Sequence, residues 1–133
     1  MLFRSLYAEL LLRALEGAPR DALLRAPAPA GASARVREIA EGGYLAKTRD
    51  QVTGSGYCVD SLEASLWCFA TTDSYEAAVL AATNLGDDAD TTAAVVGQIA
   101  GAHYGADAIP AHWREKLAMR DDIDALARAL HAR

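Results

Sequence analysis

Apolar side chains recur every three or four residues along most of the chain, which is the spacing of amphipathic helices. The first segment with this spacing covers residues 3–14, and Gly17 ends it. A short helix through Leu24 is expected next, followed by a loop rich in proline and alanine. Ser33 can cap a third helix that ends before Gly42. The first third of the chain therefore predicts three helices.

Helical spacing resumes after a stretch without clear periodicity at residues 44–56. Asp-Ser-Leu-Glu at residues 60–63 has the form of a capping box and predicts the start of a helix. The remaining helices are expected after Ser74, from Thr91 to about Tyr104, around Trp113 and over residues 123–130. No segment alternates convincingly as a strand does. The predicted fold class is therefore all-α, as a compact multi-helix bundle.

Length, composition and charge narrow the class of protein. A chain of 133 residues suits a single domain, residues 1–133, with a hydrophobic core. The net charge of −5 and the absence of a strongly basic patch argue against a surface for a nucleic-acid duplex. No apolar stretch approaches the length of a membrane span, and charges interrupt the N-terminal segment where a signal peptide would be apolar. A cytoplasmic protein that does not associate with membranes is expected.

Three carboxylates crowd into residues 87–90, between two segments that are otherwise typical of buried helices. Like charges at this spacing repel one another, so such a cluster either stays in solvent or binds a cation. The three carboxylates, together with the hydroxyls of Thr91 and Thr92, suit a hard cation, Mg²⁺ or Mn²⁺. Alternatively, Asp90 caps the following helix while Asp87 and Asp88 lie near its positive end. Spacing alone leaves both interpretations open.

Three blocks of sequence resemble one known family. Residues 86–102, which read Gly-Asp-Asp-Ala-Asp-Thr-Thr-Ala-Ala-Val-Val-Gly-Gln-Ile-Ala-Gly-Ala, resemble the C-terminal signature of the ADP-ribosylglycohydrolases. Residues 54–67 resemble the glycine-tyrosine loop and following helix of that family, and residues 109–117 resemble its next segment. Three blocks in the right order and spacing are far more specific than any one of them.

The resemblance implies an all-α fold with a two-magnesium centre that hydrolyses the N- or O-glycosidic bond of ADP-ribose or an ADP-ribosylated substrate. Asp88, Asp90 and Thr91 correspond to metal ligands of the family, with Mn²⁺ as the alternative ion. Gly56 and Tyr57 correspond to residues that line the ADP-ribose pocket, where glycine permits close approach and an aromatic ring can pack on a ribose or base. The catalytic acid or base stays unassigned.

The sequence also departs from the family. The other metal ligands of the family come from a Thr-Asp-Asp motif, which a Gly-Asp-Ala segment precedes, and neither motif occurs in these 133 residues. We therefore expect the chain to represent the C-terminal half of the family domain and to carry one side of the metal site. Apolar surface would then be exposed or buried against a partner, either another copy of the chain or a complementing N-terminal half.

Three hypotheses follow. The first is a magnesium-dependent hydrolase of ADP-ribose glycosidic bonds that needs the missing ligands. The second is a catalytically inactive remnant, or a ligand- or partner-binding helical module with an incomplete metal site. The third is a purely structural module in which the acidic turn is a helix cap, but this interpretation leaves the glycine-tyrosine block unexplained. Glu63 is interpreted in all three as an ordinary capping-box carboxylate rather than a general base.

Overall fold

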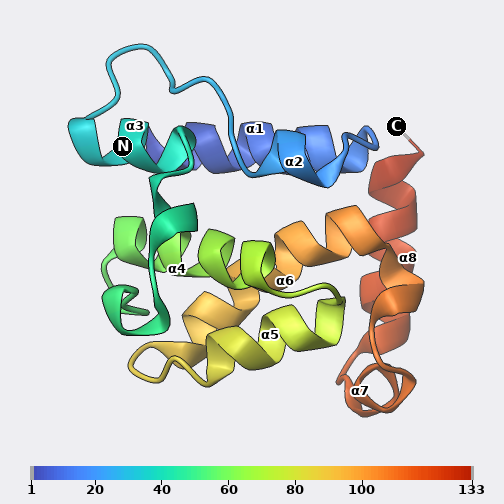
Figure 1. Cartoon of the computed structure of the whole chain (residues 1–133). Helices are drawn as coiled ribbons and strands as arrows, with labels where there is room; N and C mark the ends of the chain where they lie inside the picture. Colours follow the sequence, from blue (N-terminus) through green and yellow to red (C-terminus); the bar gives the residue numbers. More distant parts are fainter. Residues whose placement is uncertain (1, 133) are drawn as a thin grey trace.

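The computed structural model describes residues 2–132, and every regular element in that range is a helix (Figure 1). The α-helices are α1 (Phe3–Leu15), α2 (Arg20–Leu23), α3 (Ala34–Ala40), α4 (Cys58–Thr71), α5 (Tyr75–Thr83), α6 (Ala89–Tyr104), α7 (Ala111–Lys116) and α8 (Arg120–His131). Three 3₁₀ turns, η1 (Gly43–Ala46), η2 (Arg49–Gln51) and η3 (Ala106–Ala108), lie between them. The all-α prediction is confirmed.

Helix α6 is the central element of the core and packs against α1, α4 and α5. Figure 1 shows α1, α2 and α3 above α4 and α6, with α5 below. The side chains buried at these contacts are Leu6 and Leu10 from α1, Leu66 and Phe69 from α4, Ala78 and Ala82 from α5, and Val96, Ile99 and Ala100 from α6. Each fully buried large apolar side chain contributes about 1.5–3 kcal/mol relative to solvent exposure. This packing fixes the starts of α4 and α6 relative to one another.

Several helix boundaries follow the local signals in the sequence. The Ser33 side chain accepts a hydrogen bond from the Val36 amide, and the Ser74 side chain accepts one from the Ala77 amide. Each serine thereby satisfies one of the unpaired N–H groups at a helix start. Gly105 ends α6 with a φ of +85°, a value that residues with a side chain rarely adopt. The predicted caps at Ser33 and Ser74 are confirmed.

The predicted capping box at residues 60–63 is wrong. Helix α4 begins at Cys58 with Tyr57 as its N-cap, so Asp60 lies inside the first turn instead of capping it. The Asp60 carboxylate accepts a hydrogen bond from the Ser55 hydroxyl, which precedes the helix. A four-residue capping pattern is a short motif. Here the Asp60 carboxylate bonds instead to Ser55, five residues upstream.

Helix α6 begins two residues earlier than predicted, at Ala89 rather than Thr91. Gly97 and Gly101, four residues apart in α6, lie on the side of this helix that packs against α5. A Cβ atom added to Gly97 would lie 3.3 Å from the Tyr75 hydroxyl, and one added to Gly101 would lie 3.7 Å from the Tyr75 ring. The two glycines therefore accommodate an aromatic side chain from the start of α5.

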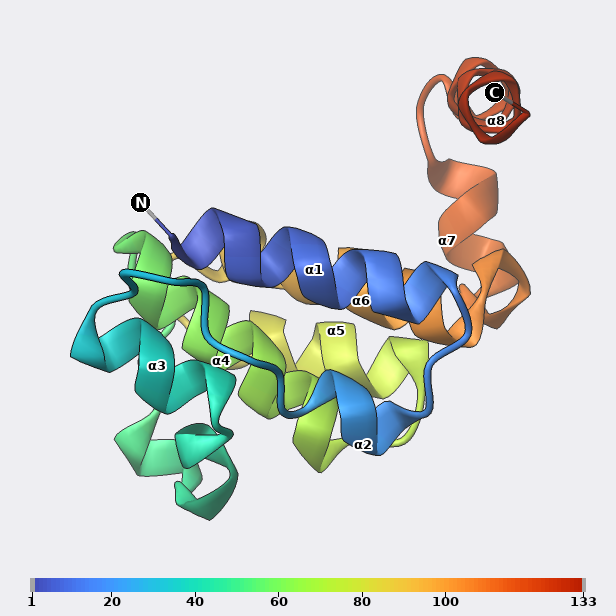
Figure 2. The same ribbon diagram turned by 90° about the horizontal axis from the view of Figure 1, so that it is seen from above.

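Helices α7 and α8 extend away from the rest of the bundle (Figure 2). The periodicity correctly predicted a helix at α8, but none of the residues of α8 is buried. The large apolar side chains exposed on this arm are Leu117, Met119, Ile123, Leu126 and Leu130. Among residues 2–132, no helix has the length and apolar character to cross a membrane.

Candidate functional site

The glycine-tyrosine loop and the acidic turn contact each other directly, although they are about thirty residues apart in sequence. The Asp88 amide donates a 3.0 Å hydrogen bond to the Gly54 carbonyl. A Cβ atom on Gly56 would lie 3.4 Å from the Asp88 carboxylate, and one on Gly54 would lie 3.3 Å from the Thr92 hydroxyl. The absence of side chains at both glycines therefore allows the loop to lie against the start of α6.

The acidic turn is held in place on both sides by hydrogen bonds from side chains to backbone carbonyls. Arg49 donates hydrogen bonds to the carbonyls of Asn84 and Leu85, where α5 ends. The buried Thr92 hydroxyl donates to the Asp88 carbonyl at 3.0 Å, as expected for a residue four positions into the helix. Ser65 of α4 in turn donates to the Thr92 carbonyl. These contacts anchor the start of α6 to α4 while leaving the acidic side chains unused.

The capping interpretation of the acidic turn does not hold for Asp90. Asp88 occupies the N-cap position of α6, and Asp90 lies in the first helical turn. The Asp88 side chain makes no capping hydrogen bond. Across residues 2–132, neither carboxylate takes part in any hydrogen bond or ion pair. Asp88 is half-buried, whereas Asp90 and Thr91 are exposed, so their oxygen atoms stay available to a ligand.

A cavity of about 280 Å³ lies between α1, α4 and α6, beside this turn. It has mainly apolar walls, and its lining includes Gly56 and Thr91 together with Tyr7, Cys58, Ser61 and Val95. The Tyr7 hydroxyl donates to the Val95 carbonyl, which closes one side. The Ser61 hydroxyl is buried and has no hydrogen-bond partner in the described part of the chain. The structure therefore brings a predicted pocket residue and a predicted metal ligand to one cavity.

The metal-binding capacity of the turn is limited in this structure. No group of three or more His, Cys, Asp or Glu residues within the described range could hold a metal ion. Asp88 and Asp90 supply carboxylate oxygens and Thr91 a hydroxyl, which is the donor chemistry that Mg²⁺ prefers. These three residues fit one side of a coordination shell, and further oxygen ligands would have to complete it.

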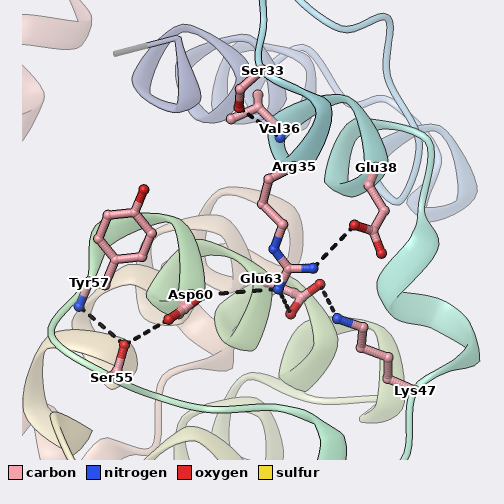
Figure 3. Close-up of polar contacts among 9 residues, drawn as sticks. All are labelled: Ser33, Arg35, Val36, Glu38, Lys47, Ser55, Tyr57, Asp60 and Glu63. Atoms are coloured by element: carbon pink, nitrogen blue, oxygen red, sulfur yellow. Dashed lines mark hydrogen bonds and ion pairs between the residues drawn. The ribbon is translucent and has the colours of Figure 1, made fainter.

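The sequence interpretation missed the ion pairs of Glu63, a residue of α4 near the candidate site. It is only 3% exposed, and its carboxylate forms 2.7 Å ion pairs with Lys47 and with Arg35 (Figure 3). The interpretation of Glu63 as a capping-box carboxylate is therefore wrong. One signal could have revealed these ion pairs. Helix α4 is buried on nearly all sides, and a carboxylate buried in such a helix requires cationic partners.

The two cysteines differ sharply in environment, which gives a first prediction. Cys58 is exposed beside the cavity, whereas burial raises the pKa of the Cys68 thiol to about 11. Because the thiolate is the reactive form, we expect a disulfide reagent at pH 8 to modify one thiol per native chain and two after unfolding. Cys58→Ser should leave the native chain unreactive. Equal reaction rates for both thiols would contradict the packing described for α4.

Comparisons with known proteins show the family of this chain. The family model for ADP-ribosylglycohydrolase matches residues 3–133. The chain is 44% identical over 128 residues to an ADP-ribosylarginine hydrolase Tri1 from Pseudomonas putida, covering 96% of this chain and 34% of the relative. It is 41% identical over 78 residues to the ADP-ribosyl-[dinitrogen reductase] glycohydrolase of Rhodospirillum rubrum, covering 54% of this chain and 26% of that protein. It is 30% identical over 115 residues to human ADP-ribosylhydrolase ARH3, covering 74% and 32% respectively.

The fold has a close counterpart among solved structures. A chain described as an ADP-ribosylglycohydrolase-related protein complex superposes with a TM-score of 0.85 at 42% sequence identity, covering 96% of this chain and 44% of that chain. The fold and the sequence matches thus define an all-helical domain of a class that acts on ADP-ribose linkages. The chain belongs to the ADP-ribosylglycohydrolase family. It spans about a third of the length of these curated relatives.

Proposed function

We propose that this chain contributes one side of a magnesium-dependent site that hydrolyses ADP-ribose glycosidic bonds. The observation that carries the proposal is the close approach of the Asp88 carboxylate to Gly56, where an added Cβ atom would lie 3.4 Å from it. That close approach joins the residues that correspond to the substrate pocket with those that correspond to the metal ligands. The relatives named for hydrolysis of ADP-ribosylarginine and of ADP-ribosylated dinitrogenase reductase support this substrate class.

The residues of the site have distinct proposed roles. Asp88, Asp90 and Thr91 would hold Mg²⁺, with Mn²⁺ as the alternative ion, and two ions would fill a complete site. With magnesium bound there, the site would gain a Lewis acid able to polarise a ribose oxygen and to orient the attacking water. Gly56 leaves room for the ribose or diphosphate beside Asp88, and the exposed Tyr57 ring offers a face on which a ribose or base can pack. Gly56 lines the cavity together with Thr91 of the acidic turn, so a substrate bound there would lie beside the proposed metal ligands.

The remaining ligands are proposed to come from a second polypeptide. A complementing N-terminal half that carries the Thr-Asp-Asp motif is one source, and association with another copy is the other. The exposed apolar side chains of the α7–α8 arm support an interaction of this kind, because burial against a partner would remove them from water. We place the protein in the cytoplasm, as the sequence analysis predicts, where its substrates would be modified proteins or small molecules.

A second candidate is a binding module without hydrolytic activity. It is favoured by the absence of a three-residue metal-ligand group within residues 2–132. Such a chain would bind ADP-ribose or a protein partner through the Gly56–Tyr57 loop and would not turn over substrate. The two candidates differ in a single measurable property, the hydrolysis of an ADP-ribosyl bond.

The test combines calorimetry with an activity assay. We expect ADP-ribose to bind the purified chain more tightly in the presence of Mg²⁺. We also expect release of ADP-ribose from ADP-ribosylarginine when the chain is mixed with the unmatched portion of the Pseudomonas putida relative. Binding without release in that mixture would favour the binding module. No binding of Mg²⁺ or ADP-ribose would contradict the first candidate and the ADP-ribose-binding form of the second.

A further inference from the structure

The glycine-tyrosine loop has little intrinsic rigidity, so its geometry must be imposed by contacts. Gly54 and Gly56 flank Ser55, and glycine populates more backbone conformations than any other residue. One end of the loop is fixed by the hydrogen bond from the Asp88 amide to the Gly54 carbonyl. The other end, which carries Tyr57, needs a separate anchor.

Asp60 supplies that anchor through Ser55 (Figure 3). The Tyr57 amide donates a 3.2 Å hydrogen bond to the Ser55 hydroxyl oxygen. The same hydroxyl donates a 3.0 Å hydrogen bond to the Asp60 carboxylate. A serine that bridges its neighbour's backbone in this way favours a tight turn, and an ionised acceptor strengthens its hydrogen bond. The conformation of the loop at Tyr57 is thus coupled to the position of Asp60.

Asp60 is itself positioned by charge. One guanidinium nitrogen of Arg35 lies 4.0 Å from the Asp60 carboxylate and 2.7 Å from that of Glu63. Lys47 pairs with the second oxygen of Glu63. The network therefore runs from α3 and η1, through the buried Glu63, to the start of α4 and the loop before it. Both carboxylates lie in α4, a rigid and largely buried helix.

We propose that Asp60, acting through Ser55, is a positioning residue that sets the loop conformation in which ADP-ribose binds. The inference rests on the function proposed above and deepens it, since neither side chain has to touch the substrate. The loop carries Gly56 and Tyr57, so a change in its geometry alters the space beside Asp88 and the direction of the Tyr57 ring.

A purely structural role for Asp60 makes different predictions. A carboxylate in the first turn of a helix interacts favourably with the helix dipole, whatever the loop does. In that case Asp60→Asn would behave like Asp60→Ala, and Ser55→Ala would have no effect. A positioning role predicts instead that Asp60→Asn resembles the unsubstituted chain and that Ser55→Ala resembles Asp60→Ala. Asp60→Asn keeps an oxygen acceptor for Ser55 and preserves the loop, whereas Ser55→Ala and Asp60→Ala both release it.

Amide hydrogen exchange of Tyr57 in the ligand-free chain tests the positioning step directly. We expect Asp60→Ala and Ser55→Ala to raise the exchange rate of this amide by up to about tenfold, the equivalent of one lost hydrogen bond. Asp60→Asn should stay within about threefold of the unsubstituted chain. Glu38→Ala is the matched control, because it removes another carboxylate partner of Arg35 that lies away from the loop.

The affinity for ADP-ribose, measured by calorimetry on the same variants, tests the consequence. We expect Asp60→Ala and Ser55→Ala to weaken binding about tenfold, and Asp60→Asn and Glu38→Ala to change it little. Unchanged Tyr57 exchange in Ser55→Ala, or equal exchange in Asp60→Asn and Asp60→Ala, would overturn the proposal. Changed exchange with unchanged affinity would overturn its functional part. If the unsubstituted chain bound no ADP-ribose, the proposed function would fail. The exchange rates would still show whether Asp60 and Ser55 hold the loop in place.

Discussion

Glu63→Ala should lower the free energy of unfolding by about 3 kcal/mol, at the low end of the range for breaking a buried ion pair. The carboxylate of Glu63 is almost completely buried and forms ion pairs with both Lys47 and Arg35. Its removal leaves two cations without their shared partner and opens a cavity in α4. The effect stays at the low end because both cations are partly exposed and can regain water. Urea unfolding followed by circular dichroism measures the change.

The control for this variant is Glu38→Ala. Glu38 also pairs with Arg35, at 3.2 Å, but its side chain is half exposed. Exposed pairs of this kind contribute less than about 1 kcal/mol, so the control should unfold at nearly the same urea concentration as the unsubstituted chain. Equal destabilisation by the two substitutions would show that burial of Glu63 does not carry the energy assigned to it.

The second large effect is expected at Asp88. Asp88→Asn should weaken Mg²⁺-dependent binding of ADP-ribose at least about tenfold, because an amide lacks the negative charge that Mg²⁺ selects in a ligand. Stability should change by less than about 0.5 kcal/mol, since the Asp88 carboxylate makes no capping bond and asparagine is an equally good N-cap. Calorimetric titration of ADP-ribose with and without Mg²⁺, together with urea unfolding, separates the two effects.

Asp87→Asn is the matched control, since it makes the same chemical change one residue away. Asp87 is exposed and adopts a φ of +56°, a left-handed conformation that asparagine also tolerates. This variant should bind ADP-ribose as the unsubstituted chain does. If both variants lost the same affinity, the acidic turn would act only through its overall charge, and the assignment of Asp88 as a ligand would be wrong.

Much of the fold could be predicted from the sequence because its signals are local. Three-four periodicity located the helices, and Ser33 and Ser74 cap as a hydroxyl before an apolar run predicts. The errors arose where a contact that periodicity does not encode decides the local geometry. The Asp60 carboxylate bonds to Ser55 rather than capping, and nothing in the spacing of the α6 glycines indicates that Tyr75 of α5 lies against them. Periodicity cannot say which element lies opposite a given face.

The candidate site, like the fold, could be predicted only in part from the sequence. The resemblance identified Gly56 and Asp88 as members of two separate blocks, and the structure places these blocks side by side through the hydrogen bond from Asp88 to Gly54. The sequence could not show that Asp88 leaves its carboxylate uncapped, because that depends on the turn formed by Gly86 and Asp87, both at positive φ. It also could not reveal the ion pairs of Glu63, whose partners lie 28 and 16 residues upstream. Charge pairing across helices is a property of the packed structure.

The function proposed here requires the glycine-tyrosine loop and the acidic turn to form one ligand-binding surface. Two-dimensional NMR of the ¹⁵N-labelled chain, titrated first with Mg²⁺ and then with ADP-ribose, tests it most directly. We predict that Mg²⁺ shifts the amide resonances of Asp88, Asp90 and Thr91, and that ADP-ribose then shifts those of Gly56 and Tyr57. Resonances that stay unchanged at both segments, or that shift only on the α7–α8 arm, would contradict the claim.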